Sequence, residues 1–282
     1  MVKKKIVIFG CSGFGKLVQY SLDNEKYEIV TYIDNCEEIQ GKNINNIKVD
    51  APYKVKNYEF DYIIISLPEY ENEMKTQLYS LGVTDEKIIT FMPNKYEVSW
   101  QEPRYAMMKN CAEQIVARNV QGNIAEVGVY QGEFASHLNC IFNDRKLYLF
   151  DTFEGFSDKD IHVNDEIIMG MDKFKDTHIE NVLKKMKHPK QVIVRKGWFP
   201  DTARNIDDEF CFVSLDTDLY KPIMSGLEYF YPRLAKGGYI FIHDFGSYNW
   251  SGVRKAVYEY CDKNKISFVP ILDKCLSVII TK

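Results

Sequence analysis

The chain has 282 residues, enough for about two domains of ordinary size. Hydrophobic residues make up 45% of it and charged residues 27%, a balance that excludes a disordered chain, a collagen-like repeat and a coiled coil. The 36 basic and 40 acidic residues give a formal net charge of −4, so we do not expect a nucleic acid partner.

Targeting and redox features of the sequence favour a cytoplasmic protein. Its apolar runs are far shorter than the ~20 residues of a membrane span, and the run 6–9 is too short for the core of a signal peptide. Seven cysteines are scattered without a Cys-x-x-Cys pair, which argues against a disulfide framework and a zinc site. Five of them fall in predicted helices or strands and are interpreted as small packing residues: Cys111, Cys140, Cys211, Cys261 and Cys275.

Residues 1–92 alternate between buried strands and helices. The predicted strands are 6–9, 28–33, 61–66 and 87–91, and the predicted helices are 16–22 and 71–81. A turn containing Gly10, Gly13 and Gly15 follows the first strand, and Asp34 follows the second. This pattern predicts a small, Rossmann-like parallel α/β domain.

After a connector at 93–103, the same pattern begins again and fills residues 104–282. Helices are predicted at 104–119, 133–141, 222–234 and 253–264, and strands at 124–127, 146–150, 191–194, 210–215 and 238–242. Residues 153–175 are irregular and suit an active-site lid, and Thr177 to Glu180 fit a capping box that opens a helix to about residue 187. The strands 267–271 and 276–281 are predicted to form an antiparallel hairpin at the sheet edge. We therefore expect two Rossmann-like modules in tandem.

The turn of the second module carries the first candidate site. It reads EVGVYQG over residues 126–132, and its glycines allow a ligand to approach the backbone closely. Asp151 ends the next strand, 23 residues after Gly128, just as Asp34 lies 24 residues after Gly10. An acid at this place can hold ribose hydroxyls, and the alternative is a tight turn followed by a surface Asp.

Four further motifs give the second module its resemblance to a known family. They are LYLFDTFEGF (147–156), KGWFPDT (196–202), SLDTDLY (214–220) and GGYIFIHDF (237–245). With these motifs the sequence from about residue 104 to 282 resembles the macrocin O-methyltransferase (TylF-like) family of S-adenosylmethionine-dependent sugar methyltransferases. The resemblance implies a class I methyltransferase sheet in the second module.

The resemblance also implies roles for individual residues in binding the cofactor. Glu126, Gly128 and Gly132 would flank the methionine part of S-adenosylmethionine. Asp151 would hold the ribose hydroxyls, and Gly197 and Trp198 would lie by the adenine. In this family an Asp-x-Asp motif and a later Asp-Asp-Tyr bind a divalent metal, which implies Asp216 and Asp244 as ligands.

Here the later triplet is His243-Asp244-Phe245, a departure that leaves His243 as a ligand, a base or a cap of the strand end. Asp216 and Asp244 end successive strands of a parallel sheet, so their carboxylates should meet at one rim and suit Mg²⁺. Asp218 is either part of this group or an acid favoured at a helix N-terminus. His162 and His178, in or beside the lid, are weaker candidates.

The predicted activity is Mg²⁺-dependent O-methylation of a sugar hydroxyl on a nucleotide sugar, a glycan or a glycosylated metabolite. His243 or Asp216 would accept the hydroxyl proton. One alternative is an NAD-dependent sugar oxidoreductase or epimerase centred on residues 1–92, but that unit contains no Tyr-x-x-x-Lys after its glycine turn. Another is a non-catalytic nucleotide-sugar-binding or docking module. The sequence does not name the acceptor, and it is compatible with a homo-oligomer.

Overall fold

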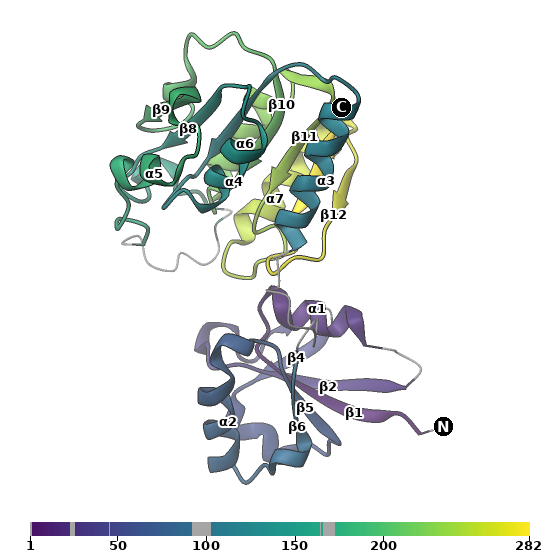
Figure 1. The fold of residues 1–282 in the computed structure, drawn as a ribbon. Coiled ribbons are helices and arrows are strands. Elements are labelled where there is room, and N and C mark those ends of the chain that lie inside the picture. Colours follow the sequence, from purple (N-terminus) through teal and green to yellow (C-terminus); the bar gives the residue numbers. More distant parts are fainter. Residues whose placement is uncertain (1, 23–25, 45, 92–102, 164, 166–172) are drawn as a thin grey trace. The chain divides into compact units, whose positions relative to one another are not determined.

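The computed structural model describes residues 2–22, 26–44, 46–91, 103–163, 165 and 173–282. The chain separates into two compact units, residues 1–100 and 101–282 (Figure 1). The predicted connector, 93–103, lies outside the described residues except for Pro103, where a helix begins. In the described part of the chain, no helix has both the length and the apolar character needed to cross a bilayer.

The first unit is a six-stranded sheet in the order β3-β4-β2-β1-β5-β6, parallel except for β3. Its strands are β1 (Lys4–Phe9), β2 (Tyr27–Ile33), β3 (Asn43–Ile44), β4 (Ile47–Asp50), β5 (Tyr62–Ile65) and β6 (Ile88–Thr90). Its helices are α1 (Gly13–Ser21) and α2 (Glu71–Ser80). The apolar runs of β1 and β5 are buried, and Met74 and Leu78 of α2 pack on one face of the sheet. The sequence prediction missed β3 and β4.

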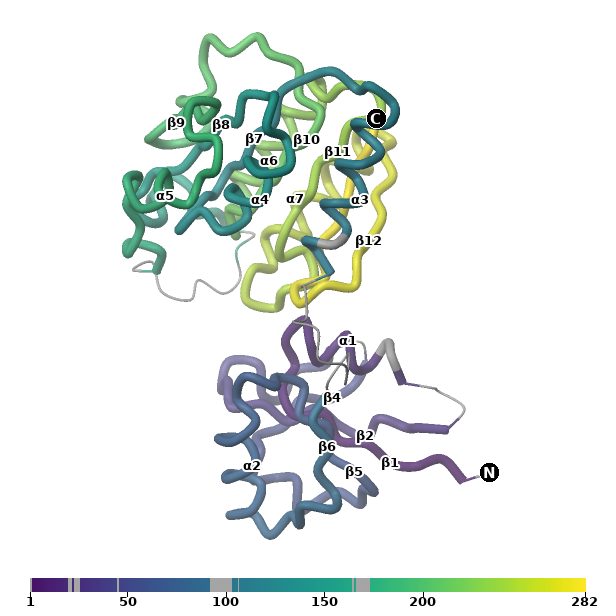
Figure 2. Tube along the Cα trace, viewed as in Figure 1, coloured from purple at the N-terminus to yellow at the C-terminus, as the bar shows by residue number. Residues whose placement is uncertain are grey.

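The second unit is a seven-stranded sheet in the order β12-β13-β11-β10-β7-β8-β9. Its strands are β7 (Asn123–Val127), β8 (Leu147–Asp151), β9 (Val192–Lys196), β10 (Phe210–Leu215), β11 (Leu234–Ile242), β12 (Phe268–Pro270) and β13 (Val278–Thr281). All neighbours are parallel except β13, which pairs antiparallel with both β11 and β12. The yellow C-terminal strands in Figure 2 are thus the predicted edge hairpin.

Helices cover both faces of this second sheet. They are α3 (Pro103–Ala117), α4 (Glu133–Ile141), α5 (Ile179–Lys185), α6 (Tyr220–Phe230) and α7 (Ser251–Asn264). Side chains alternate along each strand, so Ile124 packs with α3, α4 and α5 while Ala125 packs with α6 and α7. Two separate apolar cores result, one on each face. The prediction of two Rossmann-like modules is confirmed.

The predicted capping box before α5 is wrong. The helix begins at Ile179 with His178 as its N-cap, and no side chain caps it. The hydroxyl of Thr177 instead donates to the backbone carbonyl of Tyr130. Thr177 therefore ties the glycine turn to the segment before α5, because a tertiary partner replaces the local one.

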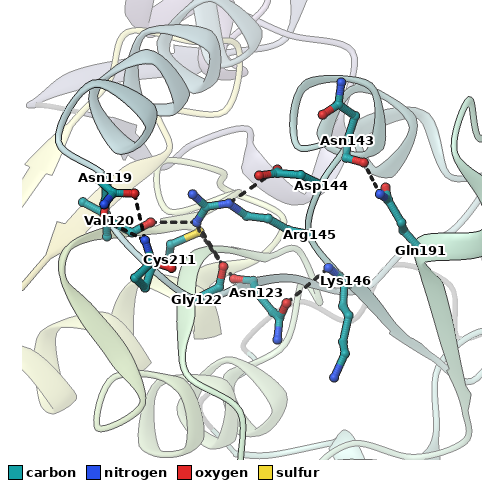
Figure 3. A network of polar contacts seen from close by, with 11 residues as sticks. Asn119, Val120, Gly122, Asn123, Asn143, Asp144, Arg145, Lys146, Gln191 and Cys211 are labelled. Carbon is teal, nitrogen blue, oxygen red and sulfur yellow. Dashed lines mark hydrogen bonds and ion pairs between the residues drawn. The ribbon is translucent and has the colours of Figure 1, made fainter.

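The opposite end of the second sheet, where the strands begin, is held by a polar network (Figure 3). Arg145 lies before β8, and its Nη1 donates to the backbone carbonyl oxygens of Val120 at 2.8 Å and Gly122 at 3.0 Å. The same nitrogen lies 2.9 Å from Cys211 Sγ on β10. These bonds satisfy backbone groups at the strand entries and leave the other ends of the strands to form the site.

Candidate active site

A cavity of about 380 Å³ lies where strands β7, β8, β10 and β11 end. In a parallel sheet these carboxyl ends are the usual place for a ligand. Eight predicted site residues line the cavity: Glu126, Gly128, Asp151, Gly197, Trp198, Asp216, His243 and Asp244. The topology thus brings together motifs that are spread over more than 110 residues of sequence.

The turn after β7 leaves no room for a side chain at Gly128. Its φ is +84°, and a Cβ there would lie 1.9 Å from the backbone oxygen of Asp216. Gly132 has another role and does not line the cavity. It is the N-cap of α4 with φ +79°, and a Cβ there would lie 2.7 Å from Val182 of α5. Gly132 therefore allows α4 and α5 to pack closely.

Asp151 at the end of β8 organises the same turn. Its Oδ2 accepts hydrogen bonds from the backbone N–H groups of Val129 at 2.6 Å and Tyr130 at 2.9 Å. Its Oδ1 accepts one from the N–H of Phe153 at 2.6 Å. The carboxylate therefore joins the ends of β7 and β8 and faces the cavity from a fixed position.

Beyond the end of β9, the strand next to β8, Trp198 forms a hydrogen-bonded pair with Asp160. The indole Nε1 of Trp198 donates to Asp160 Oδ1 at 2.7 Å, and both residues line the cavity. Burial raises the pKa of Asp160. Because Asp160 belongs to the predicted lid, this bond ties the described part of the lid to the motif KGWFPDT.

Three carboxylates gather where β10 and β11 end. Oxygens of Asp216, Asp218 and Asp244 all lie within 4.8 Å of one another. Asp218 and Asp244 have φ values of +63° and +56°, a conformation uncommon for residues other than glycine. Asp218 is not in the helix that follows, since α6 begins at Tyr220. The interpretation of Asp218 as part of the acidic group agrees with this geometry.

Two basic side chains contact this carboxylate cluster. Arg104 of α3 donates from Nη1 to Asp216 Oδ2 at 2.9 Å and from Nη2 to Ser214 Oγ at 3.0 Å. Its guanidinium lies over the ring of Phe134, 4.1 Å from the centroid. His243 Nδ1 lies 3.0 Å from Asp216 Oδ1 and 2.9 Å from Asp244 Oδ2. Sequence reasoning did not single out Arg104, which no motif marks.

Burial and neighbouring charges set the protonation of the cluster. Burial alone would raise the pKa of Asp216 and Asp244, but the charge of His243 holds both below their usual range, with Arg104 adding to the effect at Asp216. Burial opposes the charge on His243, yet Asp216 and Asp244 raise its pKa well above 6.5. Burial, Asp244 and Asp216 raise the pKa of Asp218. In this arrangement His243 keeps its proton at neutral pH.

Glu126 of β7 is a buried acid at the floor of the cavity. Its Oε1 lies 3.5 Å from Ser214 Oγ, while Oε2 has no hydrogen-bond partner within the described residues. Burial raises its pKa well above the usual range. An acceptor that is buried without a partner costs free energy, so this oxygen suits a ligand donor.

Aromatic side chains form one wall of the cavity. The ring of Phe174 lies 5.1 Å from that of Tyr130 and 5.3 Å from that of Phe156, which in turn lies 5.6 Å from Trp250. All four residues line the cavity. Two candidate histidines do not line it: His162 stacks on Tyr220 at 4.5 Å, and His178 occupies the N-cap position of α5 without a side-chain capping bond.

Residues 96–273 match the family model of the macrocin-O-methyltransferases (TylF). The chain belongs to this family. It is an O-methyltransferase, and the resemblance seen in the sequence motifs is confirmed. Residues 2–89 match a separate model, the C2185-like N-terminal domain.

Two proteins named as O-methyltransferases are similar to this chain in sequence. Mycinamicin III 3''-O-methyltransferase of Micromonospora griseorubida is 29% identical over 183 residues, which are 57% of this chain and 68% of that protein. A tetracenomycin-C 4'-O-methyltransferase of Streptomyces olivaceus, whose name specifies a dimethoxy-rhamnosyl substrate, is 26% identical over 229 residues, or 70% of this chain and 86% of that one.

Solved structures of two methyltransferases share the fold. The O-methyltransferase NovP has a TM-score of 0.57 at 25% identity, covering 64% of this chain and 79% of its own. The calicheamicin methyltransferase CalS11 has a TM-score of 0.53 at 17% identity, covering 76% and 86%. The catalytic fold is therefore that of class I methyltransferases.

Proposed function

We propose that the second unit transfers a methyl group from S-adenosylmethionine to a sugar hydroxyl with the help of a divalent cation. One observation carries the proposal: a single cavity joins the glycine turn of a methyltransferase sheet to a cluster of three carboxylates. The names of two relatives, a 3''-O-methyltransferase and a methyltransferase of a rhamnosyl compound, support a sugar acceptor.

The residues at the β7 and β8 ends suit S-adenosylmethionine. The unpartnered Oε2 of Glu126 can accept from the ammonium group of its methionine part. Gly128 lets the turn pack against the backbone of Asp216 and lines the cavity there, while Asp151 presents a carboxylate to the ribose hydroxyls. Gly197 and Trp198 offer a flat surface for the adenine, with Trp198 fixed by Asp160. Gly132 contributes through the packing of the turn.

The carboxylate cluster suits a divalent cation. Asp216 and Asp244, with Asp218 beside them, supply oxygen donors of the kind that Mg²⁺ prefers. A bound cation lowers the pKa of a coordinated hydroxyl, and the sulfonium of the cofactor supplies the methyl group. Arg104 neutralises Asp216 and keeps its carboxylate oriented.

The residues around the acceptor position it and handle its proton. The aromatic wall from Tyr130 to Trp250 can pack against the apolar face of a sugar. Asp216 and His243 are the two residues proposed to accept the hydroxyl proton. His243 can do so only once a bound cation offsets the charges of Asp216 and Asp244 that hold its own proton. His243→Ala separates the roles of that residue. Lost cation affinity identifies a ligand, whereas retained cation affinity with a flattened pH–rate profile identifies a base.

A methyl-transfer screen with radiolabelled S-adenosylmethionine tests the proposal. The full chain is incubated with nucleotide sugars and glycosylated small molecules, in EDTA and with divalent cations added back. We expect label on a sugar hydroxyl, lost in EDTA and restored by the cation. Full activity in EDTA contradicts the cation's role, and no binding of S-adenosylhomocysteine contradicts the cofactor.

A further inference from the structure

We infer that the cation site includes His243 and Cys275 together with Asp244, and that it selects a transition-metal dication of the Zn²⁺ and Co²⁺ class over Mg²⁺. This inference rests on the proposed function, because it names the cation of the same site. It also revises the expectation that the scattered cysteines hold no metal.

The three side chains come together from separate segments. Donor atoms of His243, Asp244 and Cys275 all lie within 4.8 Å of one another. Strand β11 leads into His243 and β13 follows Cys275. Because Ile242 pairs with Val278 across these antiparallel strands, the residues that follow β11 and the residues that precede β13 meet at the same end of the sheet.

The loop before β13 holds Cys275 in place. The N–H of Gly246 donates to the backbone oxygen of Cys275 at 2.9 Å. Asp273, which is fully buried, accepts from the N–H of Ser277 at 2.7 Å and also from its hydroxyl. Cys275 as a residue is half-buried. Cys275 therefore differs from Cys211 and Cys261, which are buried in the two apolar cores as predicted.

The donor types determine which cation fits. Mg²⁺ requires oxygen ligands in near-ideal octahedral geometry, whereas nitrogen and sulfur donors favour Zn²⁺ and its neighbours. With bonds of ~2.0–2.3 Å, the ligands of a tetrahedral zinc site lie about 3.3–3.8 Å apart. His243 Nδ1 and Asp244 Oδ2, now 2.9 Å apart around a proton, need only a small separation. On cation binding, the protons of Nδ1 and the thiol pass to solvent.

Asp244 belongs to both groups of potential ligands, the all-carboxylate one and the one with His243 and Cys275. Asp216 is divided between Arg104 and His243, so part of its charge is already compensated. We therefore place the cation beside Asp244, on the side of the His243 nitrogen and the Cys275 sulfur. The departure from the family triplet, His243 in place of an acid, changes the donor set at this point.

Cobalt spectroscopy on the full, metal-free chain tests the inference. We expect one equivalent of Co²⁺ to bind and to give a thiolate-to-cobalt charge-transfer band in the near ultraviolet. Cys275→Ser should remove the band, and Cys140→Ser, at an exposed cysteine of α4, should keep it. His243→Asp should lower Co²⁺ affinity at least tenfold relative to Mg²⁺ affinity.

Two results overturn the inference. One is a Co²⁺ spectrum without the thiolate band or with a band that Cys275→Ser leaves unchanged. The other is an equal affinity of the wild-type chain for Mg²⁺ and Co²⁺ in competition. Methyl transfer with Mg²⁺ and no thiolate band refutes only the inference. A thiolate band without methyl transfer to any acceptor refutes only the proposed function.

Discussion

The two units carry the same turn and the same acid, yet only the second has a cavity joined to a cluster of acids in the part of the chain described. In the first unit Asp34 Oδ2 accepts from the N–H of Cys11 at 2.8 Å, and Oδ1 accepts from the N–H of Cys36 at 2.9 Å. Asp151 makes the equivalent bonds in the second unit. An acid after the second strand therefore organises the turn whether or not a ligand binds there.

The difference lies at the end of the next central strand. In the first unit β5 leads to Ser66, whose hydroxyl donates to the backbone oxygens of Phe9 at 2.9 Å and Gly10 at 3.0 Å. In the second unit β10 leads to Asp216 and Asp218, and neighbouring β11 leads to His243 and Asp244. Each turn packs closely against the end of this strand, at Ser66 in the first unit and at the backbone of Asp216 in the second, but the second strand end presents carboxylates to the cavity. The fold is shared, and these strand ends determine the chemistry.

The largest expected effect comes from the acids at those strand ends. Asp216→Asn and Asp244→Asn should each lower the turnover of methyl transfer by at least ~100-fold, because each removes charge that orients the cation and acceptor. Affinity for S-adenosylhomocysteine, measured by calorimetry, should change little. Asp34→Asn is the matched control in the first unit and should leave turnover unchanged. Near-normal turnover of Asp244→Asn would contradict the proposed site.

A smaller effect is expected where the two units are most alike. Asp151→Ala removes charge-assisted hydrogen bonds worth roughly 1.5–3 kcal/mol each, so affinity for S-adenosylhomocysteine should fall at least tenfold. Asp34→Ala should not alter that affinity. Calorimetry on both variants, with circular dichroism to verify folding, makes the comparison. Equal affinities for the two variants would mean that Asp151 serves only the turn, as Asp34 does.

A substitution in the polar network where the strands of the second sheet begin should affect stability alone. Arg145→Met removes the guanidinium donor of the Val120 and Gly122 carbonyls, and Gly122 retains the thiol of Cys211 at 3.4 Å, so we expect a cost of about 1–3 kcal/mol of unfolding free energy. Urea denaturation followed by tryptophan fluorescence measures it, since Trp198 and Trp250 both belong to the second unit. Cofactor affinity should not change. A change in affinity without a loss of stability would contradict the separation between the two ends of the sheet.

Regular elements with continuous apolar runs could be predicted from the sequence. Strand 210–215 and helix 133–141 agree with the structure residue for residue, because glycine and polar residues mark their ends. Strands β3 and β4 are short and partly exposed, so the sequence has no apolar run that predicts them. The capping box failed because Thr177 found a partner in another part of the chain.

Asp151, Asp216 and Asp244 share a local signal in the sequence, since each closely follows a predicted strand. Arg104 and Cys275 have no such signal. Arg104 reaches Asp216 across 112 positions of sequence, and Cys275 reaches His243 only because β11 and β13 pair. A lone residue in a helix or loop becomes part of a site through tertiary packing, which no local pattern encodes.

The last prediction concerns the first unit, where we expect no effect of nicotinamide cofactors. Its turn reads Gly10-x-x-Gly13-x-Gly15, which departs from the Gly-x-Gly-x-x-Gly pattern of dinucleotide-binding turns. Within residues 1–92, no Tyr-x-x-x-Lys pair follows the turn to move a proton. The full chain with NAD or NADP and nucleotide sugars should therefore show no hydride transfer. A ligand at 100 times its Kd would stabilise the unit by about 2.7 kcal/mol, so an unchanged melting curve also tests binding. If the wild-type chain reduces NAD or NADP and Gly13→Val abolishes this reduction, the prediction is wrong. Both units would then have an active site, each with its own substrate.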